Sequence, residues 1–110
     1  MQRNVDTIWQ DPKTQQLIDV FDAIANKNDI MNFLRDVMTE KEIIEISSRL
    51  EAARMLQSGD KYTDIINQTK LSSRTIARIS KWMKDGRGGY AKALEIINNH
   101  HDHISPARTE

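Results

Sequence analysis

Apolar residues recur at intervals of three and four along most of the chain, the spacing that places side chains on one face of an α-helix. No segment shows the alternation of branched residues that predicts a β-strand. The chain is therefore predicted to be all-α, with about six helices. The apolar positions of the first two helices, over residues 15–25 and from residue 29 onward, are Leu17, Val20, Phe21, Ile24, Ile30, Phe33, Leu34 and Val37.

A longer helix is predicted to start at Thr39, because Thr39 and Glu42 have the spacing of a capping box. Gly59 and Asp60 are typical of a helix end. The apolar residues between them cover more than one narrow stripe, so we expect one face to pack within the subunit and another against a second copy. These residues are Ile43, Ile44, Ile46, Leu50, Ala53, Met55 and Leu56.

The segment 62–82 has the pattern of a helix-turn-helix. Its apolar residues fall where two short helices crossing through a tight turn would bury them against each other. Ser72 and Ser73 stand at the exit of the turn, where a hydroxyl can accept from an unpaired amide of the first helical turn. The second helix is thus predicted from Arg74 onward, and the apolar residues are Ile65, Leu71, Ile76 and Ile79.

The outward positions of this second helix are cationic or hydroxylic, which are the groups that bond phosphates and base edges. Two residues are irregular for the motif. Lys70 stands where glycine is usual and must adopt a left-handed conformation or alter the turn, and Ile66 replaces a small residue. The alternative is an amphipathic hairpin whose charges only solvate a surface. The DNA-binding residues predicted are Lys61, Thr63, Lys70, Ser72, Ser73, Arg74, Thr75, Arg78 and Lys81.

The charge distribution supports the DNA-binding interpretation although the formal net charge of the 110 residues is zero. Between Lys61 and Lys92 there are eight basic residues against Asp64 and Asp85, a net charge of +6, which leaves −6 for the rest. Such an arrangement can concentrate positive potential on one face. Ordinary scatter of surface charge is the alternative.

The composition of the chain excludes several classes of protein. A chain of 110 residues forms one domain with a limited core, and without cysteine it has neither disulfides nor a thiolate zinc site. No apolar run approaches a membrane span and no signal-peptide core is present, so we expect a cytoplasmic protein. We predict an arm over residues 1–14, a helical domain over 15–99 and a flexible tail over 100–110.

Catalytic and metal-binding chemistry find little support in the pattern. The glycine-rich segment 85–89 lacks the preceding strand of a phosphate-binding loop, so a hinge or helix break is expected there. No catalytic group is evident within the predicted helices, and we predict that the protein is not an enzyme. The tail holds residues able to ligate a transition metal, but without a second cluster no metal site is predicted; they are His100, His101, Asp102 and His103.

From Gln15 to Asn98, the order of parts resembles the Trp repressor family, and more closely its YerC/YecD group. The specific features are Met38 and Thr39 before the long helix, Arg49 within it, Arg78 in the hairpin, and Gly88-Gly89-Tyr90 before the last helix. The resemblance implies a homodimer whose outer helices interlock between two chains. Two recognition helices would then face a palindromic operator in double-stranded DNA.

The resemblance also implies a ligand pocket. In the Trp repressor, two arginines sandwich the indole ring of bound tryptophan and one holds its carboxylate, and these match Arg49 and Arg78. Thr39 matches as well. Ile79 stands where the family has a glycine beneath the ring, Trp82 where a serine faces the ligand's amino group, and Asp36 where a leucine lines the pocket.

These departures argue against tryptophan as the corepressor. Ile79 would narrow the pocket, and Trp82 either fills it or belongs to the core. The protein would then be competent without a ligand, or would respond to a smaller, differently shaped amino-acid-like corepressor. The function predicted is a sequence-specific transcriptional regulator acting as a repressor. The alternative is a protein-interaction module that kept the hairpin and lost DNA.

Overall fold

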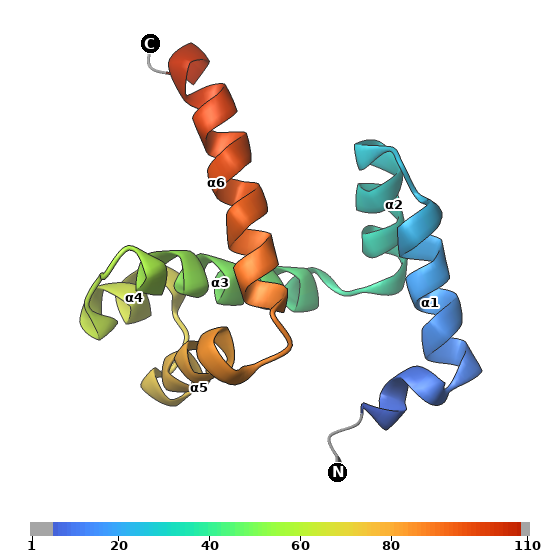
Figure 1. The fold of residues 1–110 in the computed structure, drawn as a ribbon, viewed down its shortest axis with the longest axis horizontal. Helices are drawn as coiled ribbons and strands as arrows, with labels where there is room; N and C mark the ends of the chain where they lie inside the picture. The colour runs from blue at the N-terminus through green and yellow to red at the C-terminus, as the bar shows by residue number, and fades with distance from the viewer. Residues whose placement is uncertain (1–5, 109–110) are drawn as a thin grey trace. The chain divides into compact units, whose positions relative to one another are not determined.

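The computed structural model describes the backbone of residues 6–108 and the side chains of residues 6–100. In that part of the chain all regular structure is helical, which confirms the all-α prediction with six α-helices (Figure 1). The chain divides into an N-terminal unit, Met1–Glu40, and a C-terminal unit, Lys41–Glu110. The elements are a 3-10 helix η1 (Thr7–Gln10), α1 (Pro12–Ala23), α2 (Lys27–Val37), α3 (Glu40–Gln57), α4 (Tyr62–Thr69), α5 (Ser73–Asp85) and α6 (Gly89–Arg108).

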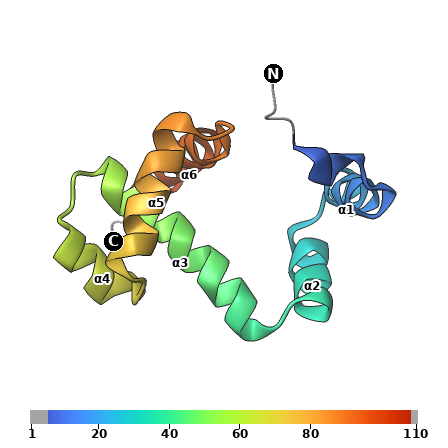
Figure 2. The ribbon, with the colours of Figure 1, turned by 90° about the horizontal axis from the view of Figure 1, so that it is seen from below.

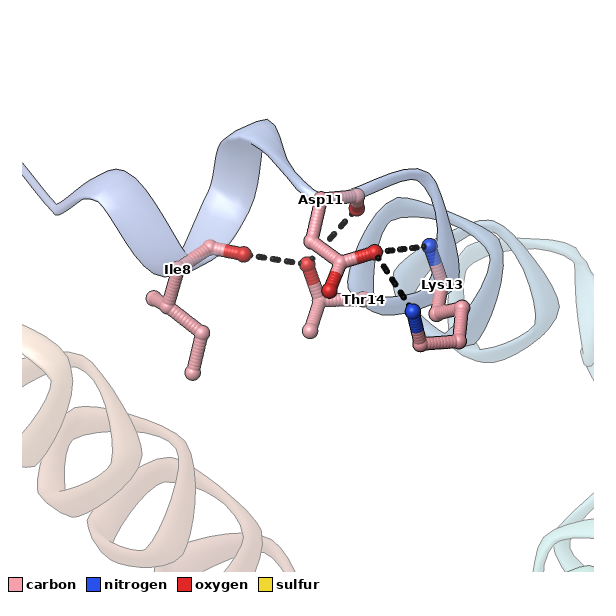
Figure 3. Close-up of polar contacts among 4 residues, drawn as sticks. All are labelled: Ile8, Asp11, Lys13 and Thr14. Carbon is pink, nitrogen blue, oxygen red and sulfur yellow. Dashed lines mark hydrogen bonds and ion pairs between the residues drawn. The ribbon is translucent and has the colours of Figure 1, made fainter.

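The start of α1 is fixed by local hydrogen bonds. The Asp11 carboxylate accepts from the Lys13 backbone N–H at 2.8 Å, and Pro12 takes a first-turn position where its missing N–H costs nothing. The Thr14 hydroxyl contacts the carbonyl oxygens of Ile8 and Asp11, which joins η1 to α1 (Figure 3). The first helix therefore begins at Pro12, within the segment predicted as an arm.

The N-terminal unit buries little of its apolar surface. Phe21 and Phe33 meet edge to face with ring centroids 5.6 Å apart, which pairs α1 with α2. Neither helix contains a buried residue. The segment 26–28 was predicted to interrupt the helices, but α2 already starts at Lys27, because the Asn26 side chain caps it by accepting from the Asp29 N–H at 3.1 Å. The large side chains left exposed in α1 and α2 are Leu17, Ile18, Phe21, Met31 and Val37.

The core lies in the C-terminal unit, where the second half of α3 packs with α4, α5 and α6 (Figure 2). The predicted buried positions of the hairpin are confirmed, with Leu71 partly buried at the edge of the core. Tyr90 and Ile97 of α6 also pack against the core, because a spacing of seven residues places them on one face of the helix. The buried residues are Ala52, Ala53, Met55, Ile65, Ile76, Ile79 and Leu94.

One glycine ends the long helix α3, and another separates the last two helices, α5 and α6. Gly59 has φ +85, and the N–H groups of Gly59 and Asp60 donate to the carbonyls of Leu56 and Met55, a Schellman ending of α3. After α5, a Cβ on Gly86 would lie 2.5 Å from the Trp82 carbonyl oxygen, so the helix break predicted in this segment requires a glycine at that position.

The last helix is longer than predicted. The predicted helical domain ends at residue 99, whereas α6 continues to Arg108. The Asn98 amide donates to the Gln57 side chain at 3.3 Å, which ties α6 to the end of α3. Among the residues that the structure describes, no helix combines the length and the apolar character needed to cross a membrane.

Candidate nucleic-acid interface

The turn between α4 and α5 is tight because one residue takes the left-handed conformation. Lys70 has φ 64 and ψ 15, and its N–H donates to the Ile66 carbonyl at 2.8 Å. The sequence left two possibilities for this lysine, and the left-handed one is found. Such a conformation costs a residue with a Cβ about 1–2 kcal/mol, so the neighbouring bonds must hold the turn in place.

The start of α5 is fixed by Ser72. Its hydroxyl oxygen accepts from the Thr75 N–H at 3.1 Å, which is the N-cap bond predicted for this position, and its hydroxyl lies 3.0 Å from the Thr75 Oγ1. Helix α5 begins at Ser73, one residue earlier than predicted. Ser72 and Thr75 thus bond each other, and Ser72 and Ser73 are both exposed.

One side of α5 is buried and the other is basic. Ile76 and Ile79 are fully buried against the rest of the unit, and Met83 continues this stripe at the edge of the core. Since residues three and four apart share a face, the positions between them point outward. Arg74, Arg78 and Lys81 occupy those positions, and all are exposed.

The cations of the hairpin are available to bind a partner. Within residues 6–100, none of the five predicted DNA-binding cations forms an ion pair, in contrast to Arg49 and Arg54 of α3. An unpaired surface cation can bind an anionic partner without first giving up an ion pair within its own chain. All five side chains are exposed: Lys61, Lys70, Arg74, Arg78 and Lys81.

The residues predicted for the ligand pocket come from both units. Thr39 lies in the N-terminal unit, whereas the other four lie in the C-terminal unit on α3 and α5. Arg49 forms an ion pair with Glu45 at 2.7 Å, one helical turn before it. Ile79 is only 1% exposed, so its side chain belongs to the core.

The first turn of α6 carries Tyr90, whose pKa responds to burial and to the charge of Arg49. Partial burial raises the pKa of the Tyr90 hydroxyl, and the Arg49 guanidinium opposes this shift by lowering the pKa. The charge of Arg49 therefore acts on the first turn of α6 as well as on its own helix.

Trp82 is not a core residue in this chain. Its side chain is 47% exposed, so of the two alternatives left open for this residue, a place in the core is not found in the single chain. The helical spacing after Ile79 allows the buried stripe to continue at either Trp82 or Met83, three or four positions on. Met83 packs against the edge of the core, partly buried, and the indole stays at the surface.

The sequence analysis did not single out Thr69 or Glu45. Thr69 is the one buried polar residue in the part of the chain that is described, and its hydroxyl donates to the Ile65 carbonyl at 2.7 Å. A threonine before a left-handed non-glycine residue was the available signal, because its hydroxyl can bond back to the preceding turn. The spacing of Glu45 and Arg49 also predicts an i,i+4 pair.

The structure contains no group of metal-ligating side chains among the residues it describes. His101, Asp102 and His103 of the predicted tail lie outside the residues whose side chains are described. His100 alone has a described side chain, and it is exposed.

A family model described as Trp repressor protein matches residues 12–98. This segment spans all of α1 to α5 and the core-packing part of α6. The chain belongs to the Trp repressor family. The resemblance drawn from Thr39, Arg49, Arg78 and the hairpin is thereby confirmed at the level of the family.

Individual proteins similar to this Trp repressor family member support the same family assignment. The uncharacterised protein YerC from Bacillus subtilis (strain 168) is 33% identical over 86 residues, 76% of this chain and 83% of YerC. The crystal structure of a TrpR-like protein from Eubacterium eligens ATCC 27750 matches with a TM-score of 0.78 at 28% identity, over 84% of this chain and 96% of that one. A solved Staphylococcus aureus structure matches with a TM-score of 0.74 at 25% identity, over 86% and 95% respectively.

Proposed function

We propose that this Trp repressor family member is a sequence-specific DNA-binding transcriptional regulator, acting as a repressor. The observation that carries the proposal is the two-sided character of α5, with Ile76 and Ile79 in the core and unpaired cations along the outer face. A helix held in this way on a helix-turn-helix can enter the major groove with its first turn leading.

The proposed contacts divide by their position on the hairpin. Arg74 lies in the first turn of α5 and is assigned to a guanine, whose O6 and N7 suit a bidentate guanidinium. Ser73 and Thr75 flank it and reach base edges or the nearest phosphates, while Ser72 contributes by starting the helix. Phosphate contacts, which fix register and supply affinity, are assigned to Lys61, Thr63, Lys70 and Lys81, and Arg78 serves either the backbone or the pocket.

We assign the regulator a homodimeric state and a palindromic operator. Support comes from the N-terminal unit, where α1 and α2 bury no residue and expose large apolar side chains. Ile44 and Ile46 at the start of α3 are exposed as well. A small chain gains stability by covering such surfaces with a second copy, and a two-fold protein reads two half-sites about one helical turn apart.

The regulation we propose does not use tryptophan. Arg49 already pairs with Glu45, and Ile79 places a core side chain where the family has a glycine. Trp82 exposes its indole on the same helix as Arg78, and we assign it to the space that a ligand would need beside Arg78. Calorimetric titration with millimolar tryptophan is expected to show no saturable heat; tight saturable binding would exclude the closed pocket.

Selection of bound duplexes from fragmented genomic DNA tests the proposed function. Parallel selections with and without pooled amino acids would show whether a small amino-acid-like corepressor controls binding. We expect enrichment of a palindromic sequence under both conditions. Recovery of no duplex DNA at low salt, where phosphate attraction is strongest, would instead favour a protein-interaction module.

A further inference from the structure

The buried hydroxyl of Thr69 both donates and accepts a hydrogen bond. The residue is 7% exposed and ends α4. Its hydroxyl donates to the Ile65 carbonyl at 2.7 Å, and the same oxygen accepts from the Leu71 N–H at 3.2 Å. Because the side chain is buried, it does not reach a partner molecule on the surface. Its two bonds act only within the hairpin.

The two bonds span the left-handed residue of the turn. Lys70 lies between Thr69 and Leu71, and a non-glycine residue keeps a positive φ only where its surroundings determine it. The first bond fixes the Thr69 hydroxyl on the last turn of α4, and the second fixes the backbone just beyond Lys70. Ser72 follows immediately and caps α5. The Thr69 hydroxyl therefore bonds the chain on both sides of Lys70, directly before α5 begins.

We propose that Thr69 is a positioning residue for DNA recognition. Its hydroxyl sets the direction of the first turn of α5, and so the approach of Arg74 to the bases, without contacting DNA. The inference rests on the proposed DNA-binding function and adds a residue that the interface itself does not contain. Phosphate contacts tolerate small rotations better than bidentate base contacts, since they carry charge attraction rather than a fixed donor pattern.

The test compares Thr69→Val, which keeps the shape and loses the hydroxyl, with Thr69→Ser, which keeps the hydroxyl. Each is titrated by fluorescence anisotropy against the duplex enriched by the wild-type protein and against a scrambled duplex, at a temperature where circular dichroism shows a folded chain. Thr69→Val should weaken binding to the enriched duplex about tenfold, the loss expected when one bidentate base contact is misplaced. Binding to the scrambled duplex should stay unchanged, and Thr69→Ser should retain the wild-type preference.

Equal losses on both duplexes, or no loss on either, would overturn the positioning role while leaving the proposed function intact. Absence of DNA binding by the wild-type chain would overturn both. If Thr69→Val does not fold, the comparison is made in a Lys70→Gly background, where glycine removes the strain of the turn. Both chains then lack Lys70, so the ratio of their affinities still reports the hydroxyl.

Discussion

Arg74 is the residue on which sequence discrimination is expected to depend. Its side chain is exposed and unpaired within residues 6–100, in the first turn of α5. Arg74→Ala should cost about 1–3 kcal/mol of discrimination at one base position and relax the preference there. A repeat of the duplex selection with this variant provides the measurement, with Lys84→Ala in the last turn as the control. An Arg74→Ala protein with the wild-type preference would contradict the assignment.

Lys70 should show opposite effects on stability and on binding. Lys70→Gly relieves the left-handed conformation at φ 64 and is expected to raise the free energy of unfolding by about 0.5–1 kcal/mol, after the entropy of glycine in the unfolded chain is counted. It also removes one phosphate contact, which should weaken binding to all duplexes alike and lower the salt slope by about one.

Urea denaturation and anisotropy titrations at several salt concentrations measure the two effects of Lys70→Gly. The matched control is Lys84→Gly, a helical lysine with an ordinary φ, where glycine should lower the free energy of unfolding by about 1 kcal/mol. Lower stability of Lys70→Gly would show that the turn does not strain the lysine.

At the scale of single residues, the sequence predicted what depends on local chemistry. The Ser72 cap follows from a hydroxyl at a helix start, and the conformation of Lys70 was one of two that the turn allows. The role of Thr69 could not be predicted in the same way, because it depends on burial that only the packed hairpin creates. The place of Trp82 could not be predicted, because three-residue and four-residue spacing are both helical and only packing selects Met83 for the core edge.

The junction between α5 and α6 depends on Gly86. An added Cβ would lie 2.5 Å from the Trp82 carbonyl oxygen, so Gly86→Ala must displace the backbone at the end of α5. We expect it to lower the free energy of unfolding by about 1–3 kcal/mol, the usual cost of overpacking. Gly89→Ala is the matched control, since its Cβ would meet nothing within 4 Å. Equal denaturation midpoints for the two variants would show that the close approach is relieved at no cost.

The helices were predictable where an apolar stripe and a cap coincide. Helix α5 has both, with Ile76 and Ile79 in the core and Ser72 as its cap, and Gly59 ends α3 as expected. The start of α2 was predicted two residues too late, because Asn26 caps the helix and lets it begin at Lys27. The extension of α6 to Arg108 was missed because its last residues lack an apolar stripe.

At the scale of the whole molecule, the apolar surface of α1, α2 and the start of α3 is the feature that the single chain does not explain. If a second copy covers it, the melting temperature should rise with protein concentration. Ile44 is 59% exposed in the chain, and Ile44→Glu should shift the protein to a monomer in sedimentation experiments and lower its melting temperature. Lys41→Glu on the same helix is the control. A monomeric wild-type protein would contradict the homodimer.

The most direct test of the account is a titration of the wild-type protein against its enriched duplex and a scrambled duplex at several salt concentrations. We predict tighter binding to the enriched duplex by about 10³-fold or more, the range typical of specific regulators. Both affinities should fall linearly with the logarithm of salt concentration, because several phosphates are neutralised. Equal affinities would contradict sequence-specific recognition, and no binding to either duplex at the lowest salt would contradict a DNA-binding function for the hairpin.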